Sequence, residues 1–276
     1  MTVFQIIKRV LDQEYDHLEG SPTKRDKAVT EALVALGKAY GNVLAKGGPD
    51  LSDPTIRFAY IYRYSTAHAN MVYEFIRSSD VLSELFDQDA LTISCVGGGP
   101  GSDLLGAFKY LLTTKKKPKL FFYLLDKEEG WGESWADVDQ VTGPDLNSST
   151  NFRTLDVCEP ENWRKQRKFL QADLFTFIYF FSELYSQKDK ATEFFDYLFS
   201  GAKQGARFLF IDFRDSNLSD WFDGLCKKHG IEIVESGVKS FQVDYDEEKR
   251  DLADYFKTFD NPKITASISY RIGRKK

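Results

Sequence analysis

A glycine-rich segment is the strongest chemical signal in this sequence. Residues 97–101 read Gly-Gly-Gly-Pro-Gly, between an apolar run at 91–96 and another at 102–112. Glycine permits the sharp turns and the close backbone approach that a bound ligand requires. A helix that begins directly after such a loop offers unpaired N–H groups and the positive end of its dipole. The segment therefore predicts a site for a nucleotide-like ligand.

Acidic residues follow the next two predicted strands. Asp126 follows the strand expected at 119–125, and Asp156, with Val157 beside it, follows the strand expected at 151–155. In a parallel sheet, ligands bind outside the carboxyl ends of the strands, where successive strand ends lie together. An acid at the second strand end is placed to bind both hydroxyls of a ribose, while Asp156 and Val157 would meet the edge and face of an adenine. A second alignment gives the adenine contact to Asp173 instead. Each acid could also simply cap a helix or shape a loop.

The surrounding pattern indicates which elements position these residues. Residues 1–90 are predicted to be helical, with helix starts at Ser21-Pro22 and Asp53-Pro54. From residue 91 onward, apolar strands alternate with helices, which predicts a doubly wound α/β sheet. We expect seven strands in a mostly parallel sheet with a reversed final strand, and two regions, an N-terminal helical cap (1–90) and a sheet domain (91–276). The strands are expected at 91–96, 119–125, 151–155, 175–181, 205–211, 231–236 and 264–272.

These motifs resemble those of the class I S-adenosylmethionine-dependent methyltransferases, over residues 91–276. The resemblance is carried by the glycines of a GxGxG motif, by Asp126 as the ribose acid and by Asp156-Val157 as the adenine pair. It implies S-adenosylmethionine as the cofactor and no metal. The family usually has an acid two residues before the first glycine, where this chain has Cys95, so Asp103 or the backbone would bind the cofactor's amino group. The cofactor-binding residues implied are Gly97, Gly98, Gly99, Gly101, Asp103, Asp126, Asp156, Val157 and Ser182.

A dinucleotide reading of the glycine loop fits less well. The G-x-G-x-x-G motif of NAD and FAD sites would place its third glycine at Ser102 or Leu104, depending on the alignment. A nucleotide-binding dehydrogenase is therefore the weaker alternative.

Candidates for the acceptor side lie on both sides of the glycine loop. Tyr60, Tyr64 and His68 are spaced four apart and would share one face of a helix, which we expect to form a lid (about 50–80) over the cofactor. His68 could act as a general base because the ordinary histidine pKa lies near neutrality. Glu183, after the fourth strand, could take a proton. Tyr64, His68 and Glu183 are the catalytic candidates, although a buried structural histidine and a helix-start acid are the competing interpretations.

Composition limits the remaining possibilities. The net charge is −5, and the cysteines are Cys95, Cys158 and Cys226, with no Cys-x-x-Cys pair. We expect a reduced, cytoplasmic protein (nuclear not excluded) with no membrane span. The lysines of 115–119 should lie at the sheet edge opposite the cofactor, and the acidic run 244–248 should be a solvated loop.

The predicted activity is transfer of a methyl group from S-adenosylmethionine to a nitrogen or oxygen acceptor. The acidic charge and the aromatic lid favour a small molecule or a peptide over RNA. An RNA methyltransferase of the same fold and a catalytically silent cofactor-binding sensor or scaffold remain alternatives.

Overall fold

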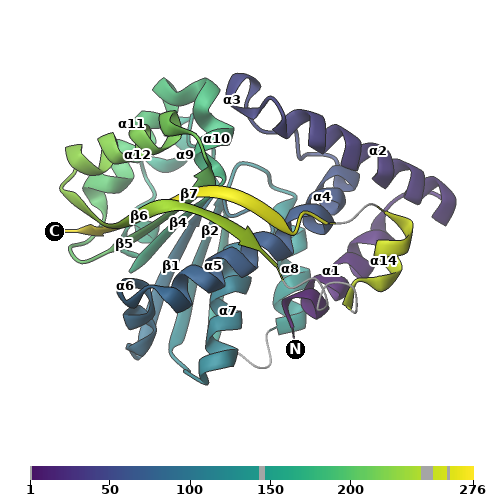
Figure 1. The fold of residues 1–276 in the computed structure, drawn as a ribbon, viewed down its shortest axis with the longest axis horizontal. Helices are drawn as coiled ribbons and strands as arrows, with labels where there is room; N and C mark the ends of the chain where they lie inside the picture. The colour runs from purple at the N-terminus through teal and green to yellow at the C-terminus, as the bar shows by residue number, and fades with distance from the viewer. Residues whose placement is uncertain (1, 143–146, 244–250, 260–261) are drawn as a thin grey trace.

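A computed structural model describes residues 2–142, 147–243, 251–259 and 262–276. Within these residues one sheet of seven strands has the spatial order β3-β2-β1-β4-β5-β7-β6 (Figure 1). The strands are β1 (Ala90–Val96), β2 (Lys119–Asp126), β3 (Ser148–Thr154), β4 (Leu174–Ile178), β5 (Arg207–Phe213), β6 (Ile231–Gln242) and β7 (Thr265–Lys275). The acidic run 244–248 lies outside the described residues.

The sheet changes direction at one strand. β1 to β5 run parallel to their neighbours, whereas β7 is inserted antiparallel between β5 and β6. The prediction of a mostly parallel seven-stranded sheet with a reversed final strand is therefore confirmed. The strand order also reverses at β1, which has β2 on one side and β4 on the other, and such a switch point is where open α/β sheets bind ligands.

Helices precede the sheet and connect its strands. The helices before β1 are α1 (Val3–His17), α2 (Pro22–Tyr40), α3 (Val43–Lys46), α4 (Pro54–Tyr60), the π-helix η1 (Ile61–Ser65), α5 (Thr66–Ser78), α6 (Asp80–Ser83) and the short 3₁₀ helix η2 (Glu84–Asp87). The later ones are α7 (Ser102–Thr114), α8 (Trp131–Thr142), α9 (Pro160–Trp163), η4 (Lys168–Gln171), α10 (Phe180–Leu184), η5 (Tyr185–Gln187), α11 (Lys188–Gly201), α12 (Ser216–Lys228) and α14 (Ala253–Thr258). Both predicted proline-containing helix starts are confirmed. No helix in the described part of the chain is both long and apolar enough to cross a membrane.

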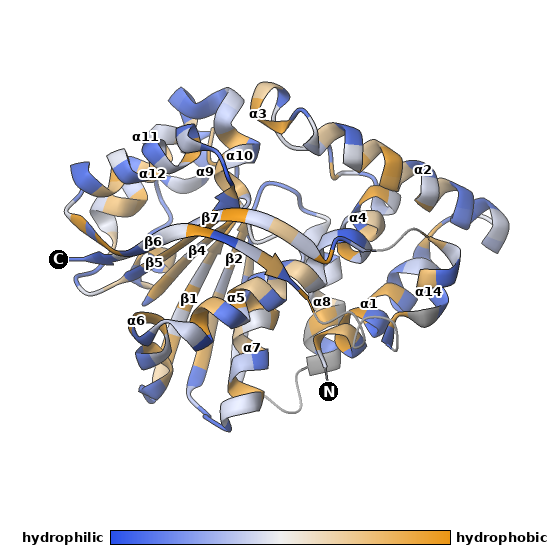
Figure 2. Cartoon of the chain, in the orientation of Figure 1, coloured by the Kyte–Doolittle hydropathy of each residue, from blue (hydrophilic) through white to orange (hydrophobic). Residues whose placement is uncertain are grey.

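Two apolar cores cover the two faces of the sheet, and Figure 2 shows stretches of hydrophobic residues along the central strands. One core includes residues of α1, α5, α7 and α8, and the other includes residues of α9, α11 and α12. The helices before residue 90 share the first core with β1 and β2. Their packing is therefore continuous with the sheet, and the division of the chain at residue 90 stays a prediction.

The fourth strand ends earlier than the sequence pattern predicts. The expected strand was 175–181, but β4 ends at Ile178 and Phe180 begins helix α10. Tyr179, between them, has a φ of +56°, a left-handed conformation that stops an extended strand. A short apolar and aromatic run does not distinguish strand from helix, which explains the error. Ser182 and Glu183 therefore lie on a helix rather than at a strand end.

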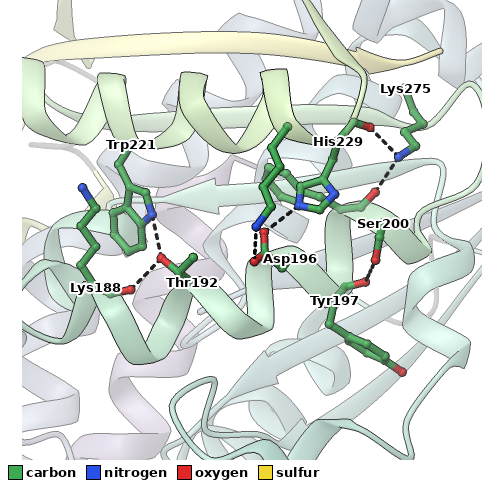
Figure 3. Close-up of polar contacts among 10 residues, drawn as sticks. Lys188, Thr192, Asp196, Tyr197, Ser200, Trp221, His229 and Lys275 are labelled. Carbon is green, nitrogen blue, oxygen red and sulfur yellow. Dashed lines mark hydrogen bonds and ion pairs between the residues drawn. The ribbon is translucent and has the colours of Figure 1, made fainter.

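The edge of the sheet away from the glycine loop is fixed by polar contacts between helices and β7. Asp196 of α11 receives hydrogen bonds from Lys228 and His229, each at 2.7 Å (Figure 3). Lys275 donates to the carbonyl oxygens of Phe199 and His229 at 2.8 and 2.7 Å. Burial opposes ionisation of Asp196, but these two donors lower its pKa below the ordinary value. The two Lys275 contacts attach the end of β7 to α11 and to His229, which follows α12.

Candidate active site

The glycine loop follows β1 in a conformation that only glycine fits. Gly97, Gly99 and Gly101 have φ angles of +68°, +47° and +80°. A Cβ atom on Gly97 would lie 2.1 Å from the ring of Phe180, and one on Gly101 would lie 2.7 Å from the ring of Trp135. The loop is therefore packed tightly between α10 and α8, as well as being conformationally restricted.

Asp126, at the end of β2, is joined directly to this loop. Its Oδ2 accepts a hydrogen bond from the Gly99 N–H at 3.0 Å, and its Oδ1 accepts from the Glu128 N–H at 2.9 Å. Burial raises the pKa of Asp126 to about 6. The sequence predicted that the loop and this acid would meet, and the structure brings them together.

A cavity of about 190 Å³ adjoins Asp126, and we call it the strand-end cavity. It is closed on one side by the segment 46–51 and on the other by Phe180 and Glu183. Asp156 and Val157 also line it, although the Asp156 Oδ1 accepts from the Cys158 N–H at 2.8 Å and so shapes its own turn as well. Its full lining is Lys46, Gly47, Gly48, Pro49, Leu51, Asp126, Lys127, Leu155, Asp156, Val157, Cys158, Phe180, Glu183, Leu184 and Gln187.

Asp173, the alternative adenine contact, lies at the other end of the sheet. Its carboxylate accepts from the Thr92 N–H at 2.8 Å and pairs with Lys203 at 2.6 Å, just before β4 begins. Because ligands of such sheets bind at the carboxyl ends of the strands, the alignment that used Asp173 is wrong.

Asp103 lies beside the position where the sequence has Cys95. Asp103 is buried in the first turn of α7, and its Oδ2 accepts from the hydroxyl of Thr176, the β4 partner of Cys95, at 2.5 Å. Burial raises the pKa of Asp103 to about 7. Burial and the nearby Asp103 carboxylate both raise the pKa of the Cys95 thiol. A carboxyl group from the helix thus occupies the region where β1 supplies none.

Two buried donors near the glycine loop have no acceptor among the described residues. They are the Ser102 hydroxyl and the Trp131 indole N–H. The Trp131 ring lies next to Gly99, since a Cβ atom built there would be 3.9 Å from the indole nitrogen. An unsatisfied buried donor costs about 1–3 kcal/mol, so both groups are suited to a ligand that supplies acceptor oxygens.

Arg57 is a structural element of the site that sequence reasoning missed. Its Nη1 donates to the carbonyl oxygens of Leu51 and Ser52 at 3.1 and 2.8 Å, and it lies 3.8 Å from a Glu128 oxygen. The guanidinium also packs on Gly130, where a Cβ atom would be 2.3 Å from Cζ. Arg57 therefore fastens the segment that covers the strand-end cavity to the loop after β2. Only its burial identifies it, and the sequence gives no comparable signal.

The predicted aromatic helix lies over the strand ends. α4, η1 and α5 form one helix with a π turn at Ile61–Ser65, a feature that is frequent at functional sites. Tyr60, Tyr64 and His68 share a face, as predicted, with ring centroids 5.2 Å apart for the first pair and 5.9 Å for the second.

This face lines a second cavity of about 390 Å³, which we call the aromatic cavity. It lies above Tyr179 and Phe213, which come from the ends of β4 and β5. Helix α2 closes it on the side opposite the sheet. Its lining is Gly37, Tyr40, Gly41, Tyr60, Arg63, Tyr64, His68, Tyr179, Phe213, Lys263 and Thr265.

His68 is buried and stacked on Tyr179 with ring centroids 4.8 Å apart. Burial, and secondarily the nearby Lys263, lower the pKa of His68 to about 3. The expectation of a pKa near neutrality is therefore wrong, because the packed rings remove the water that would solvate an imidazolium. A histidine with this pKa is a weak base.

The two cavities meet at a hydrogen bond. Tyr40 lines the aromatic cavity, and its hydroxyl donates to Oε1 of Glu183, which lines the strand-end cavity, at 2.7 Å. Burial raises the pKa of Glu183 to about 7. Ser182, in contrast, lines neither cavity: its N–H donates to Asp212 and its hydroxyl to the Tyr179 carbonyl, each at 3.0 Å.

Comparison with known proteins identifies the fold. No family model matches the chain, and no curated protein matches its sequence. Among solved structures, an O-methyltransferase family protein from Burkholderia thailandensis superposes with a TM-score of 0.53 at 12% identity, covering 91% of this chain and 72% of the other. The fold is that of the class I methyltransferases. A methyltransferase from Methanosarcina mazei (TM-score 0.48, 12% identity, 71% and 97% covered) and a precorrin-6y methyltransferase from Geobacter metallireducens (0.42, 14%, 71% and 85%) are more distant matches.

Four carboxyl groups with raised pKa values gather at the carboxyl edge of this methyltransferase fold. Burial raises the pKa of Asp126 and Asp212 to about 6 and that of Asp103 and Glu183 to about 7. Perturbed groups of this kind are characteristic of functional sites. A cation bound among them would stabilise their charged forms. The described residues contain no cluster of three or more His, Cys, Asp or Glu side chains suited to a metal ion.

A separate basic cavity of about 400 Å³ lies on another part of the methyltransferase fold, against β2 and β3. Its cations are Arg153 on β3 and Lys165, Arg167 and Lys168 in the segment before β4. The only helix of the β3–β4 connection that precedes this segment is α9, with four residues, so this face of the two strands is incompletely covered. The four cations suit this cavity to a polyanion.

Proposed function

We propose that the protein is an S-adenosylmethionine-dependent methyltransferase that transfers the methyl group to a nitrogen or oxygen of a small molecule or peptide. One observation carries this proposal. A cavity lined by Asp126, Asp156 and Val157 meets an aromatic cavity at the hydrogen bond between Tyr40 and Glu183. A donor site and an acceptor site that share a boundary are what a group transfer requires.

The residues of the strand-end region fit S-adenosylmethionine. The cofactor carries a sulfonium and an ammonium group, and the four raised-pKa carboxyl groups complement both charges. Its carboxylate would satisfy the Ser102 hydroxyl and the Trp131 N–H, which otherwise lack acceptors. Asp126 would hold the ribose and Asp156 with Val157 the adenine, while Asp103 would bind the amino group.

When bound, the cofactor supplies an activated methyl group. The chain's own residues would orient the acceptor, exclude water and take up the proton. The rings of the aromatic cavity would orient the acceptor and exclude water from it. Tyr40 would take the proton of the acceptor atom while passing its own to Glu183, which becomes a neutral carboxylic acid. A pKa of about 7 suits Glu183 to this role, since a general base works best near the operating pH.

The size of the aromatic cavity favours a small acceptor. Its volume of about 390 Å³ falls within the range of about 300–1,000 Å³ that small-molecule sites occupy. A peptide could enter with one side chain.

Calorimetry with S-adenosylmethionine and its demethylated product tests the proposal. Both should bind the native protein, and Asp126→Asn should weaken binding about tenfold or more, because a hydrogen bond to a charged group is worth about 1.5–3 kcal/mol. Asp173→Asn is the matched control, an acid-to-amide change at the opposite end of the sheet, and should leave the affinity unchanged. Failure of both ligands to bind at submillimolar concentration would refute the proposal. Binding without turnover over a panel of acceptors would favour a sensor.

RNA methylation is the second candidate, and the basic cavity is the observation that favours it. Affinity for single-stranded RNA should then fall steeply with salt, and Arg167→Gln with Lys168→Gln should reduce the salt dependence, because each phosphate contact contributes to that slope. Salt-independent or undetectable binding would remove this candidate.

A further inference from the structure

Lys263 brings a positive charge into the aromatic cavity. Its side chain is partly buried just before β7, with Nζ 6.0 Å from the ring centroid of Tyr64 and 5.5 Å from that of Phe213. Its backbone N–H donates to the Arg63 carbonyl at 2.8 Å, which fastens it to the π turn. Among the described residues, no carboxylate lies within 4.0 Å of its ammonium group.

The charged residues that line this cavity are both cations. Among the residues that the structure describes, these are Arg63 and Lys263, while Glu183 lines the other cavity. Burial and the positive charge of Arg63 lower the pKa of Lys263. Contacts with aromatic faces compensate the charge of an ammonium group only weakly, whereas a charge-assisted hydrogen bond to a carboxylate compensates it more fully. The cavity is therefore complementary to an anion.

The remainder of the lining is suited to a planar apolar body. Rings surround the space on the sheet side and the helix side, and they belong to Tyr40, Tyr60, Tyr64, His68, Tyr179 and Phe213. On α2, a Cβ atom at Gly37 would have no heavy atom within 4 Å, so the space beside this part of the wall is open.

We propose that the aromatic cavity binds a small aromatic carboxylate, with Lys263 as the residue that recognises the anionic group. Binding of this ligand does not depend on the proposed function. The further step, that the ligand is the methyl acceptor, rests on the proposed function. Lys263 then determines acceptor specificity, and the rings align the body of the ligand toward the boundary with the strand-end cavity.

Calorimetry with a matched pair of probes tests this. 4-Hydroxybenzoate and the uncharged 4-hydroxybenzamide have nearly the same shape, so the carboxylate should bind native protein at least about tenfold more tightly if a charge-assisted hydrogen bond recognises it. Lys263→Met should abolish this preference, and Lys263→Arg should retain most of it. Lys239→Met is the matched control, because Lys239 also lies over an aromatic ring, 5.4 Å from the centroid of Phe75, but outside the cavity.

The outcomes separate this inference from the proposed function. Equal affinity for the two probes, absence of binding by either at millimolar concentration, or loss of the preference in Lys239→Met would overturn it. Binding of the demethylated cofactor product is measured in parallel on every variant. If that product fails to bind while the protein still prefers the carboxylate probe as expected, the proposed function is refuted but the inference of an anion site is supported.

Discussion

The hydroxyl of Tyr40 lies 2.7 Å from Oε1 of Glu183, and this hydrogen bond joins the linings of two different cavities. Its donor comes from α2 and its acceptor from α10, so the contact connects the N-terminal helices to the end of β4. If Glu183 takes the acceptor's proton, Glu183→Gln should lower kcat by about 10²–10⁴-fold.

The matching tyrosine variant refines this prediction. Tyr40→Phe removes the hydroxyl that takes the acceptor's proton and passes its own to Glu183, so kcat should fall about as much as in Glu183→Gln. Tyr197→Phe is the control, because the part-buried hydroxyl of Tyr197 also donates a hydrogen bond, to the Gln166 carbonyl at 3.0 Å, but lies away from both cavities. Single-turnover rates measure the effect, and an unchanged rate in Glu183→Gln would exclude this residue as the base.

The pH dependence of turnover should report the same carboxyl group. A base must be deprotonated to act, so kcat/KM should rise with pH through an apparent pKa of about 7, the value to which burial raises Glu183. Glu183→Gln should remove this limb of the profile. His68, with a pKa of about 3, would instead produce a rise near that pH, so a limb there would assign the role to the histidine.

Gly97→Ala should prevent cofactor binding and destabilise the protein. The new Cβ atom would lie 2.1 Å from the ring of Phe180, and the residue has a φ of +68°. Gly205→Ala imposes a similar backbone strain at a φ of +83° but meets no atom within 4 Å. Thermal unfolding of both variants separates the two effects. A loss of stability that is equal in the two would mean that the Phe180 contact has no consequence.

The parts of the site that the sequence predicts are those encoded locally. The glycine loop and Asp126 each follow a single apolar run, and the topology of a parallel sheet brings strand ends together, so their 3.0 Å contact could be anticipated. The spacing of Tyr60, Tyr64 and His68 similarly predicted a shared helix face. The loop–Asp126 contact required a local pattern and one topological rule, and the shared helix face required the spacing alone.

The parts that could not be predicted depend on packing between distant segments. Tyr40 and Arg57 acquire their roles from contacts with Glu183 and with the loop around Glu128, and neither has a sequence signal. The pKa of His68 follows from burial, which spacing does not reveal. The start of α10 depends on the left-handed conformation of Tyr179, which a run of apolar residues does not encode.

Binding of S-adenosylmethionine should release protons. At pH 6.5, carboxyl groups with pKa values of about 6–7 are partly protonated, and a bound cation stabilises their charged forms and lowers those pKa values. Calorimetry in buffers of different ionisation enthalpy counts the protons. The demethylated product lacks the sulfonium charge, so it should release fewer. Equal release by both ligands would show that the carboxyl groups do not respond to the sulfonium.

Asp103 should carry the recognition that the family assigns to the position of Cys95. Asp103→Asn retains the contact with Thr176 but removes the charge that would bind the cofactor's amino group. Affinity for S-adenosylmethionine should fall about tenfold to a hundredfold, since a hydrogen bond to a charged group contributes about 1.5–3 kcal/mol. Methylthioadenosine, which lacks the amino acid portion, should bind the variant and the native protein equally, and Cys95→Ala should leave both affinities nearly unchanged. If Asp103→Asn weakens both ligands alike, the residue supports the fold of the loop and does not recognise the amino group, which would then have to be bound by the backbone.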